Sequence, residues 1–340
     1  MLAWLWLVVC SGWSAEPAHV VFVIGDGMGL AQVTTARAVK GEDLYLQSAQ
    51  AVGLQTTWST ELVTDSAAGA TAMSCGIKTE NGRVGQGPDG QACTTLIEEA
   101  IGASWRTGVV VTSRISHATP AAFLAHHPTR KEESAIAAQI LQLPVDLLVG
   151  GGRDMFPTGR AALRPWRERR VTVLDGRQAI LAHHALPLVG FTSPASPPAV
   201  AERGPTAPLA THALGLLREG SQRSFLLVEG SQIDWGGHRN DVDGVVSEVF
   251  DLDDTVRALV QAGGEDTLVV VTADHDTGGL SLLGGQVSGG PVDAHFSTSG
   301  HSAVMVPVYA WGPGAEAFTG VYDNTALHGR LRAAMGLGQP

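Results

Sequence analysis

Short apolar runs recur along the chain, and each is bounded by glycine, aspartate or proline. They are rich in valine, isoleucine and leucine and alternate little with polar residues, as expected for strands that are covered on both faces. The runs that predict strands are residues 19–24, 108–112, 146–149, 171–174, 225–228, 267–272 and 306–311.

Segments with the spacing of helices lie between these runs. They cover residues 30–39, 66–74, 94–104, 131–141, 208–217 and 246–262. Strands that alternate with helices form mainly parallel sheets, because a crossover helix returns the chain to the edge from which each strand starts. The pattern therefore predicts an α/β fold with a mainly parallel central sheet and helices on both faces.

The length and composition are sufficient for one large core. The chain has 340 residues, of which 44% are hydrophobic, and we expect a single domain over residues 16–340. The region 152–208 departs from the strand and helix pattern, because it is rich in proline and carries an arginine cluster at 164–170. We interpret it as an irregular peripheral region with its arginines on a solvated face.

The N-terminus has the character of a leader. Residues 2–9 are apolar but too few to span a bilayer, so we predict a signal peptide over residues 1–15 and export to the periplasm or outside the cell. Cys10 lies in a weak match to a lipoprotein site, which leaves lipid anchoring as an alternative. Cys75 and Cys93 either form a disulfide in an oxidising compartment or stay as two buried thiols.

The charge distribution excludes one class of partner. The net charge is −11 and no basic block stands out, so a nucleic-acid surface, which needs lysine and arginine against phosphates, is not expected. An acidic chain can still bind phosphate locally where metal cations offset its carboxylates.

Acid and imidazole side chains follow the apolar runs at widely separated positions. Asp26 follows the first run, Glu229 and Asp234 follow the run at 225–228, and Asp274 and His275 follow the run at 267–272. Ligands of doubly wound proteins bind beyond the carboxyl ends of the strands, so these side chains are expected to converge there.

Ser66 stands in a segment of small residues at the predicted start of a helix. A serine hydroxyl is a weak nucleophile at neutral pH and needs a base or a metal to activate it. The free amides and dipole of a helix N-terminus favour an incoming phosphate. Taken alone, Ser66 after Asp65 favours the interpretation as an ordinary helix cap.

The donor types suit metal ions. Asp234 and His238 are spaced by one helical turn, and Asp274 and His275 are adjacent. Such oxygen and imidazole donors suit zinc with a position left for substrate, and carboxylates with a threonine hydroxyl suit magnesium. Cations would also explain how several acids can crowd together. Singly, each motif could be no more than a turn or a capped strand end.

Together these segments resemble the alkaline phosphatase family. They occur in the family's order and cover nearly the whole chain outside the leader and the region 152–208. The matching segments are 25–29, 64–71, 117–122, Arg130, 228–234 with His238, 272–279 and 299–301. The stretch between Gly279 and His301 is short for the family, which implies a small or absent cap and an open site.

The resemblance implies hydrolysis of small phosphate monoesters through a phosphoserine on Ser66, with release of inorganic phosphate and an alcohol. Arg130 would clamp the phosphate, steadied by Asp65. Relatives are commonly homodimers. The implied metal sites are one zinc ion on Asp234, His238 and His301, a second zinc ion on Asp26, Asp274 and His275, and one magnesium ion on Asp26, Thr119 and Glu229.

Two positions depart from the best-known bacterial pattern. His117 stands where some members carry aspartate near magnesium, and a histidine there can bind zinc directly. Trp235 stands where lysine or histidine often contacts phosphate through water. We therefore expect this protein to bind inorganic phosphate more weakly than a relative with lysine at that position.

Two other classes of function compete with the monoesterase. One is another hydrolase of the superfamily, such as a phosphodiesterase or a sulfatase, although diesterases generally use threonine and lack the Glu229 site, and the sulfatase motif is absent at Ser66. The other is an exported protein that binds metal or phosphate without turnover. Such a protein would be expected to have lost the nucleophile or a ligand, yet Ser66 and Arg130 are both present.

Overall fold

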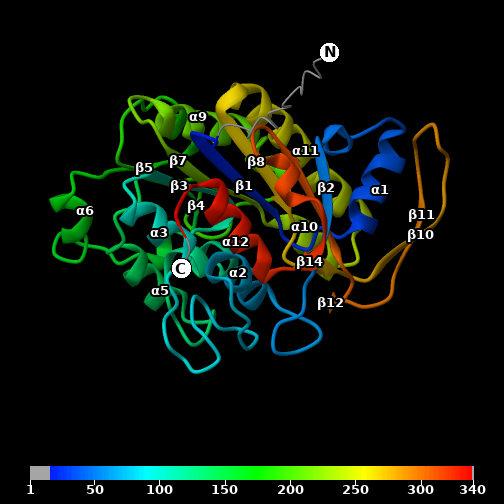
Figure 1. The fold of residues 1–340 in the computed structure, drawn as a ribbon, viewed down its shortest axis with the longest axis horizontal. Coiled ribbons are helices and arrows are strands. Elements are labelled where there is room, and N and C mark those ends of the chain that lie inside the picture. Colours follow the sequence, from blue (N-terminus) through cyan, green and yellow to red (C-terminus); the bar gives the residue numbers. More distant parts are fainter. Residues whose placement is uncertain (1–15, 339–340) are drawn as a thin grey trace, which may run out of the picture.

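The computed structural model describes residues 16–338, so the predicted signal peptide and Cys10 lie outside the described residues. Ten strands form one central sheet (Figure 1). They are β1 (His19–Gly25), β2 (Ala51–Thr56), β3 (Arg106–Arg114), β4 (Leu147–Gly151), β5 (Thr172–Asp175), β6 (Leu188–Phe191), β7 (Ser224–Gly230), β8 (Thr267–Thr272), β13 (Val306–Trp311) and β14 (Gly320–Asp323).

The sheet is mainly parallel, as predicted. Its strand order is β14-β2-β13-β8-β1-β7-β3-β4-β6-β5, and β13 is the strand that runs antiparallel to both of its neighbours. The central strands β1, β7 and β8 are buried along their whole length. This burial on both faces explains why their sequences are continuous apolar runs.

Helices cover both faces of the sheet, and each face has its own hydrophobic cluster (Figure 1). Val20, Phe22 and Ile24 of β1 point to one face, and Val21 and Val23 point to the other. The helices that contribute to the first face are α2 (Ser66–Cys75), α3 (Leu96–Gly102), α4 (Ala118–Leu124), α5 (Glu133–Ile140), α6 (Arg164–Glu168) and α12 (Thr325–Ala334). Those that contribute to the second are α1 (Leu30–Lys40), α7 (Arg177–Leu181), α9 (Ala207–Arg218), α10 (Gln232–His238) and α11 (Val242–Gly263).

Several elements differ from the sequence prediction. Strand β2 was not expected because alternate positions, from Val52 onward, are at least partly exposed, so no continuous apolar run marks it. Strand β14 is short and nowhere fully buried. The region 152–208 supplies α6, α7, the short α8 (Val200–Arg203) and the two strands β5 and β6 at one edge of the sheet.

The stretch between Gly279 and His301 forms a small hairpin in place of a large cap. Its strands are β10 (Leu280–Gly284) and β11 (Asp293–Phe296), paired antiparallel. A second short pair, β9 (Asp276–Thr277) and β12 (His301–Ser302), brings the end of this stretch back beside the chain that follows β8.

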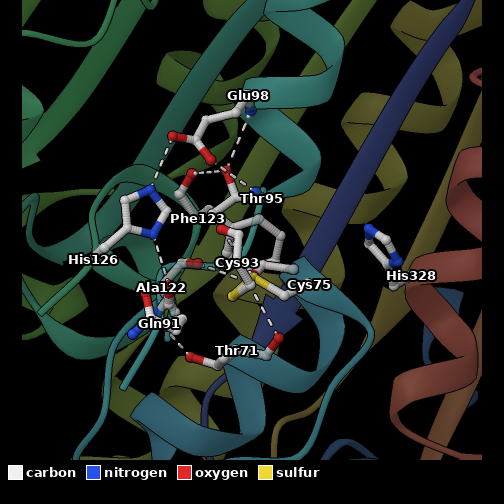
Figure 2. The surroundings of a disulfide bond; sticks show 12 residues. Thr71, Cys75, Gln91, Cys93, Thr95, Glu98, Ala122, Phe123, His126 and His328 are labelled. Carbon is white, nitrogen blue, oxygen red and sulfur yellow. Dashed lines mark hydrogen bonds and ion pairs between the residues drawn. A yellow bond between two sulfur atoms is a disulfide. The ribbon is translucent and has the colours of Figure 1, made fainter. Parts of the chain in front are cut away.

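Two further features bear on the sequence analysis. Cys75 and Cys93 form a disulfide that joins the end of α2 to the chain before α3 (Figure 2). The sequence alone had left this pairing open. Within residues 16–338, every helix is too short or too polar to cross a bilayer.

Candidate active site and metal centre

Three neighbouring strands bring the candidate carboxylates to one edge of the sheet. In register, Gly25 at the end of β1 pairs with Gly230 of β7. Asp26 follows β1, Glu229 is the next-to-last residue of β7, and Asp274 lies just beyond β8. Because parallel strands end on the same side, the sequence positions that seemed scattered become neighbours, as predicted.

A tight turn after β1 lets α10 approach the strand ends. Gly27 has φ +73°, and a Cβ atom there would lie 2.8 Å from the Cα atom of Asp234. The backbone N–H of Gly27 donates to Oδ1 of Asp274 at 3.1 Å. Glycine at this position therefore permits both the left-handed turn and the close approach of two site residues.

Asp234, His238 and His301 form the first donor group. Nε2 of His238 lies 3.3 Å from Oδ1 of Asp234 and 3.2 Å from Nε2 of His301. Nε2 of His301 lies 3.5 Å from the same oxygen of Asp234. Backbone carbonyls face the other ring nitrogens, at Ser299 for His238 and at Thr64 for His301. This arrangement turns both Nε2 atoms toward one point, as a zinc ion requires.

Asp26, Asp274 and His275 form the second donor group, and all three are buried. Nε2 of His275 lies 3.5 Å from Oδ1 of Asp26 and 3.2 Å from Oδ2 of Asp274. Oγ of Ser66 lies 3.2 Å from that same nitrogen. The serine hydroxyl therefore adjoins the point where the three donors meet.

Asp26 also belongs to a third group, with His117 and Glu229. One ligand atom from each of the three lies within 4.8 Å of the others. Oγ of Ser113 donates to Oε2 of Glu229 at 3.1 Å. Thr119 is buried at the start of α4, and its hydroxyl has no hydrogen-bond partner among the described residues. His117 thus lies within ligand distance of the carboxylates that the resemblance assigns to magnesium.

The buried carboxylates lack the partners that would balance their charge. Within residues 16–338, both oxygens of Asp26, Oδ2 of Asp274 and Oε1 of Glu229 have no hydrogen-bond partner. Burial, reinforced by the charge of Asp274, raises the pKa of Asp26 well above its usual value. Burial also raises the pKa of Asp274 to about 6 and that of Glu229 to about 7. The donor set therefore fits bound cations, which would satisfy these oxygens and offset their repulsion.

Asp234 differs from the other carboxylates because histidines face it. Burial acts to raise the pKa of Asp234, but hydrogen bonds from His238 and His301 outweigh burial and hold that pKa well below its usual value. The hydrogen bond to Asp234 in turn raises the pKa of His238 to about 9. The proton that this raised pKa keeps on His238 supplies positive charge beside Asp234, as a cation does when it is bound.

Ser66 is the first residue of α2, and Asp65 is the N-cap. Oδ1 of Asp65 accepts the N–H of Ala68 at 3.0 Å, so the helix cap considered from the sequence is present. Small residues let the helix pack against the site, and a Cβ atom on Gly69 would lie 3.2 Å from Asp274. The cap and the nucleophile candidate are therefore parts of the same turn, which directs free amides toward the site.

Arg130 reaches this turn from the chain after α4. Its Nη1 lies 3.1 Å from Oδ2 of Asp65 and 3.4 Å from Oγ of Ser66, and its Nη2 lies 3.4 Å from Nε2 of His117. Although burial acts to raise the pKa of Asp65, Arg130 and two backbone amides lower it overall. The structure therefore holds a guanidinium and the serine hydroxyl side by side, where both can meet one phosphate.

Trp235 lies on α10 next to Asp234, and its ring meets the ring of His117 edge-on at a centroid distance of 6.1 Å. The two positions that depart from the best-known pattern are thus in contact with each other. A change at either one alters the surroundings of the other.

Sequence reasoning missed two residues that support the site. Oγ1 of Thr277 donates to Oδ1 of Asp234 at 2.5 Å and lies 3.2 Å from Nδ1 of His275. Thr277 therefore contacts both the first and the second donor group. Thr277 lies within the segment 272–279 that resembles the family, so the sequence did mark its position. Asn81 accepts the N–H of Asp65 at 3.1 Å but lies outside every motif, so the sequence carried no signal for it.

Comparison with known proteins agrees with this geometry. The family model described as "Alkaline phosphatase" matches residues 18–294. Alkaline phosphatase 3 of Bacillus subtilis is 30% identical, and the match covers 92% of this chain and 87% of that protein. Streptomycin-6-phosphate phosphatase of Streptomyces griseus is 33% identical, with coverage of 95% and 91%.

Solved structures give the same result. The alkaline phosphatase of the Antarctic bacterium TAB5 superposes with a TM-score of 0.87 at 34% identity, and the match covers 95% of this chain and 99% of that chain. A histidine-to-aspartate variant of the TAB5 enzyme, which has magnesium bound in its M3 site, has a TM-score of 0.88 at 32% identity with the same coverage. The family match over most of the chain, together with these relatives, shows that the chain belongs to the alkaline phosphatase family.

Proposed function

We propose that this enzyme hydrolyses phosphate monoesters in two steps, with Ser66 as the nucleophile and a phosphoserine as the intermediate. The observation that carries the proposal is the position of the Ser66 hydroxyl. It lies 3.2 Å from Nε2 of His275, inside the second donor group, and 3.4 Å from Nη1 of Arg130. The proposed nucleophile Ser66, the second donor group and the proposed phosphate clamp Arg130 thus lie next to one another.

In the first step, Arg130 binds two oxygens of the phosphate and Asp65 keeps the guanidinium in plane with them. Oγ of Ser66 attacks the phosphorus in line with the leaving group. The Ser66 hydroxyl gives up its proton to water as a bond forms between Oγ and phosphorus. The bond from phosphorus to the ester oxygen breaks, and the alcohol leaves after taking up a proton from water. The amides at the start of α2 stabilise the charge on the transferring group.

In the second step, water attacks the phosphoserine from the side that the alcohol has left. The bond between phosphorus and Oγ of Ser66 breaks, the serine takes back a proton, and inorganic phosphate leaves. Arg130 holds the same oxygens throughout, so positioning and electrostatic stabilisation supply most of the rate.

We propose that Asp234, His238 and His301 hold one zinc ion and that Asp26, Asp274 and His275 hold a second. Asp26, Thr119 and Glu229 would hold magnesium, with His117 as a further donor that could recruit zinc instead. When bound, these cations lower the pKa of the serine hydroxyl and offset the charge of the phosphate. Their removal would leave Ser66 as an ordinary serine.

The test compares hydrolysis of p-nitrophenyl phosphate by the wild type and by Ser66→Ala, with metal content measured on both. The wild type should turn over and lose activity on chelation, and zinc with magnesium should restore it. Ser66→Ala should lose about 10³-fold or more of the activity while keeping its metals. A Ser66→Ala variant with near wild-type turnover would contradict the proposal.

The same assay separates the competing classes. A phosphodiesterase would prefer bis(p-nitrophenyl) phosphate to the monoester. A protein that only binds metal or phosphate would show zinc binding without turnover of either ester. The monoesterase is favoured because the candidate nucleophile beside Arg130 is a serine and because Glu229 belongs to the third donor group.

We also propose that the enzyme is a homodimer. Val52 on β2 and Val321 on β14 are 53% and 64% exposed at one edge of the sheet, and Val304 and Met305 precede the adjacent β13. A second copy of the chain would cover these apolar side chains. Sedimentation of the wild type and of Val321→Asp tests this, because the variant should dissociate while keeping its fold.

We propose export for the protein, with a signal peptide over residues 1–15 and a single catalytic domain over residues 16–340. The disulfide between Cys75 and Cys93 supports an oxidising compartment. Cleavage near residue 15 followed by release would exclude lipid anchoring at Cys10. The intact mass of the protein recovered from the periplasm or the medium decides between the two outcomes.

A further inference from the structure

The chain between the two cysteines connects both ends of the helix that carries Ser66. We call residues 76–92 the cysteine loop, because the disulfide between Cys75 and Cys93 closes it. The loop leaves the C-terminal end of α2 and runs back along the helix to Asp65 at its N-terminal end. It then passes Thr71 and reaches Cys93, which is bonded to Cys75. It therefore contacts the turn at Ser66 although it contains none of the candidate site residues.

Gly82 contacts both Arg130, the proposed phosphate clamp, and Asp65, which pairs with the Arg130 guanidinium. Its backbone N–H donates to Oδ1 of Asp65 at 3.0 Å, and its carbonyl oxygen accepts the backbone N–H of Arg130 at 2.7 Å. The other carboxylate oxygen of Asp65 pairs with the Arg130 guanidinium. One residue of the cysteine loop thus fixes the main chain of Arg130 against the carboxylate that orients its side chain.

Asn81 fixes the position of the adjacent residue, Gly82. Its Oδ1 accepts the backbone N–H of Asp65 at 3.1 Å and the hydroxyl of Ser59 at 2.8 Å, and its Nδ2 donates to the carbonyl of Val63 at 3.0 Å. These bonds tie the cysteine loop to the segment that leads into Ser66. The polar atoms of the Asn81 side chain are therefore hydrogen-bonded to other residues of the protein. Asn81 can affect phosphate binding only by positioning those residues.

The rest of the cysteine loop is fastened at several more points. Val84 and His127 exchange two backbone hydrogen bonds of 2.9 and 2.8 Å. Nδ1 of His126 lies 2.6 Å from the carbonyl of Gly85, and its Nε2 lies 2.9 Å from Glu98. Figure 2 shows the ring of His126 beside the disulfide, reaching toward Glu98. The contacts at 126 and 127 hold the chain that leads to Arg130.

We propose that Asn81 is a positioning residue that presets the Arg130 guanidinium for phosphate, within the framework of the disulfide-closed cysteine loop. The inference rests on the proposed function, in which Arg130 binds the phosphate. An arginine side chain loses rotational freedom when it binds a ligand, and a site that already orders it binds more tightly. Loss of Asn81 releases the amide of Asp65 and the peptide at 82, so Arg130 must be ordered by the phosphate itself.

The test measures inhibition by inorganic phosphate and hydrolysis of p-nitrophenyl phosphate for three loop variants. Asn81→Ala should raise both the inhibition constant of phosphate and the KM about tenfold, with kcat within about threefold of wild type and unchanged zinc content. Asn81→Asp keeps an acceptor for the Asp65 amide and should show a smaller rise. Glu80→Ala is the matched control, because its exposed carboxylate pairs with Arg83, and it should match the wild type.

A double-mutant cycle distinguishes positioning from a general loss of structure. In an Arg130→Gln background, Asn81→Ala should leave the phosphate inhibition constant unchanged, because there is no guanidinium left to position. An equal rise in both backgrounds would overturn the proposal, as would an unchanged constant in the single variant.

Hydrogen exchange gives a readout that does not depend on activity. The amides of Gly82 and Arg130 should exchange about tenfold faster in Asn81→Ala, and in Asn81→Asp to a smaller extent, than in Glu80→Ala. Unchanged exchange in both Asn81 variants would show that Asn81 does not hold the loop. If the wild type failed to hydrolyse phosphate monoesters, the proposed function would fall, and the exchange measurement would still decide the role of Asn81.

Discussion

Oγ of Ser66 lies 3.2 Å from Nε2 of His275. Burial and the nearby His301 hold the pKa of His275 well below its usual value, so the ring is neutral. Thr277 faces the opposite ring nitrogen, which leaves Nε2 turned toward the serine and the carboxylates of Asp26 and Asp274. The candidate nucleophile and the second donor group are therefore one structural unit.

Replacement of Arg130 by lysine should weaken phosphate binding. Lysine keeps the charge but cannot span two phosphate oxygens or reach Asp65 and His117 in the same plane. We expect the phosphate inhibition constant to rise about 10- to 100-fold, as for the loss of one or two charged hydrogen bonds. Inhibition assays measure it, and the control is Arg83→Lys in the cysteine loop, where Arg83 pairs with the exposed Glu80. Equal inhibition of wild type and Arg130→Lys would show that Arg130 is not the clamp.

Zinc affinity should rise with pH. The raised pKa of Asp274, to about 6, and of Glu229, to about 7, means that protons compete with metal at these oxygens below neutrality. Between pH 6 and pH 8 the protons leave, so zinc should bind progressively more tightly to the metal-stripped protein. Titration calorimetry with zinc at the two pH values checks this at Asp274, and titration with magnesium checks it at Glu229, where Glu229→Gln is expected to flatten the rise. Tighter binding at pH 6 would reverse the sign and contradict the assignment.

Lysine in place of Trp235 should make inorganic phosphate a stronger inhibitor. Trp235 contacts His117 beside the clamp and carries no charge for phosphate. An ammonium group there would add a charged contact, which lowers the phosphate inhibition constant about tenfold and slows product release. Steady-state inhibition and kcat measure the two effects. Trp166→Phe, a buried substitution on α6 away from the site, controls for the loss of an indole ring. A Trp235→Lys enzyme that binds phosphate no more tightly would count against this interpretation.

The disulfide should stabilise the protein more than any single surface contact does. It closes a segment with a sequence separation of 18, for which the loss of chain entropy in the unfolded state predicts about 3 kcal/mol. Denaturant unfolding of Cys75→Ser with Cys93→Ser measures the difference. Because the cysteine loop fixes Arg130, the double variant should also bind phosphate less tightly. A variant as stable as the wild type would show that the loop is held by its hydrogen bonds alone.

The sequence predicted the centre of the molecule better than its edges. Strands β1, β7 and β8 are buried on both faces, so their apolar runs carried a clear signal, and the acids that follow them were found for the same reason. Strand β2 is at least partly exposed at alternate positions and β14 is at least partly exposed at every position, so neither shows the pattern of a buried strand. Strand β2 is placed by its pairing with β13, and β14 is placed by its pairing with β2, which a local pattern does not encode.

The donors of the site were found more completely than the residues that orient them. Asp26, Asp274 and His275 stand directly after strands, where their chemistry is conspicuous. Asn81 and Thr277 act through hydrogen bonds to other segments that only the folded chain brings together. An asparagine in a loop has many ordinary explanations in a sequence, so only the geometry identifies its partners.

The central claim is that phosphate passes through Ser66. The most direct measurement is mass spectrometry of peptides from the zinc- and magnesium-loaded enzyme, quenched in acid after incubation with inorganic phosphate at low pH. We predict a phosphorylated peptide with the modification on Ser66, absent from Ser66→Ala. An active enzyme whose peptides carry no phosphate at Ser66, or carry it on another residue, would contradict the account.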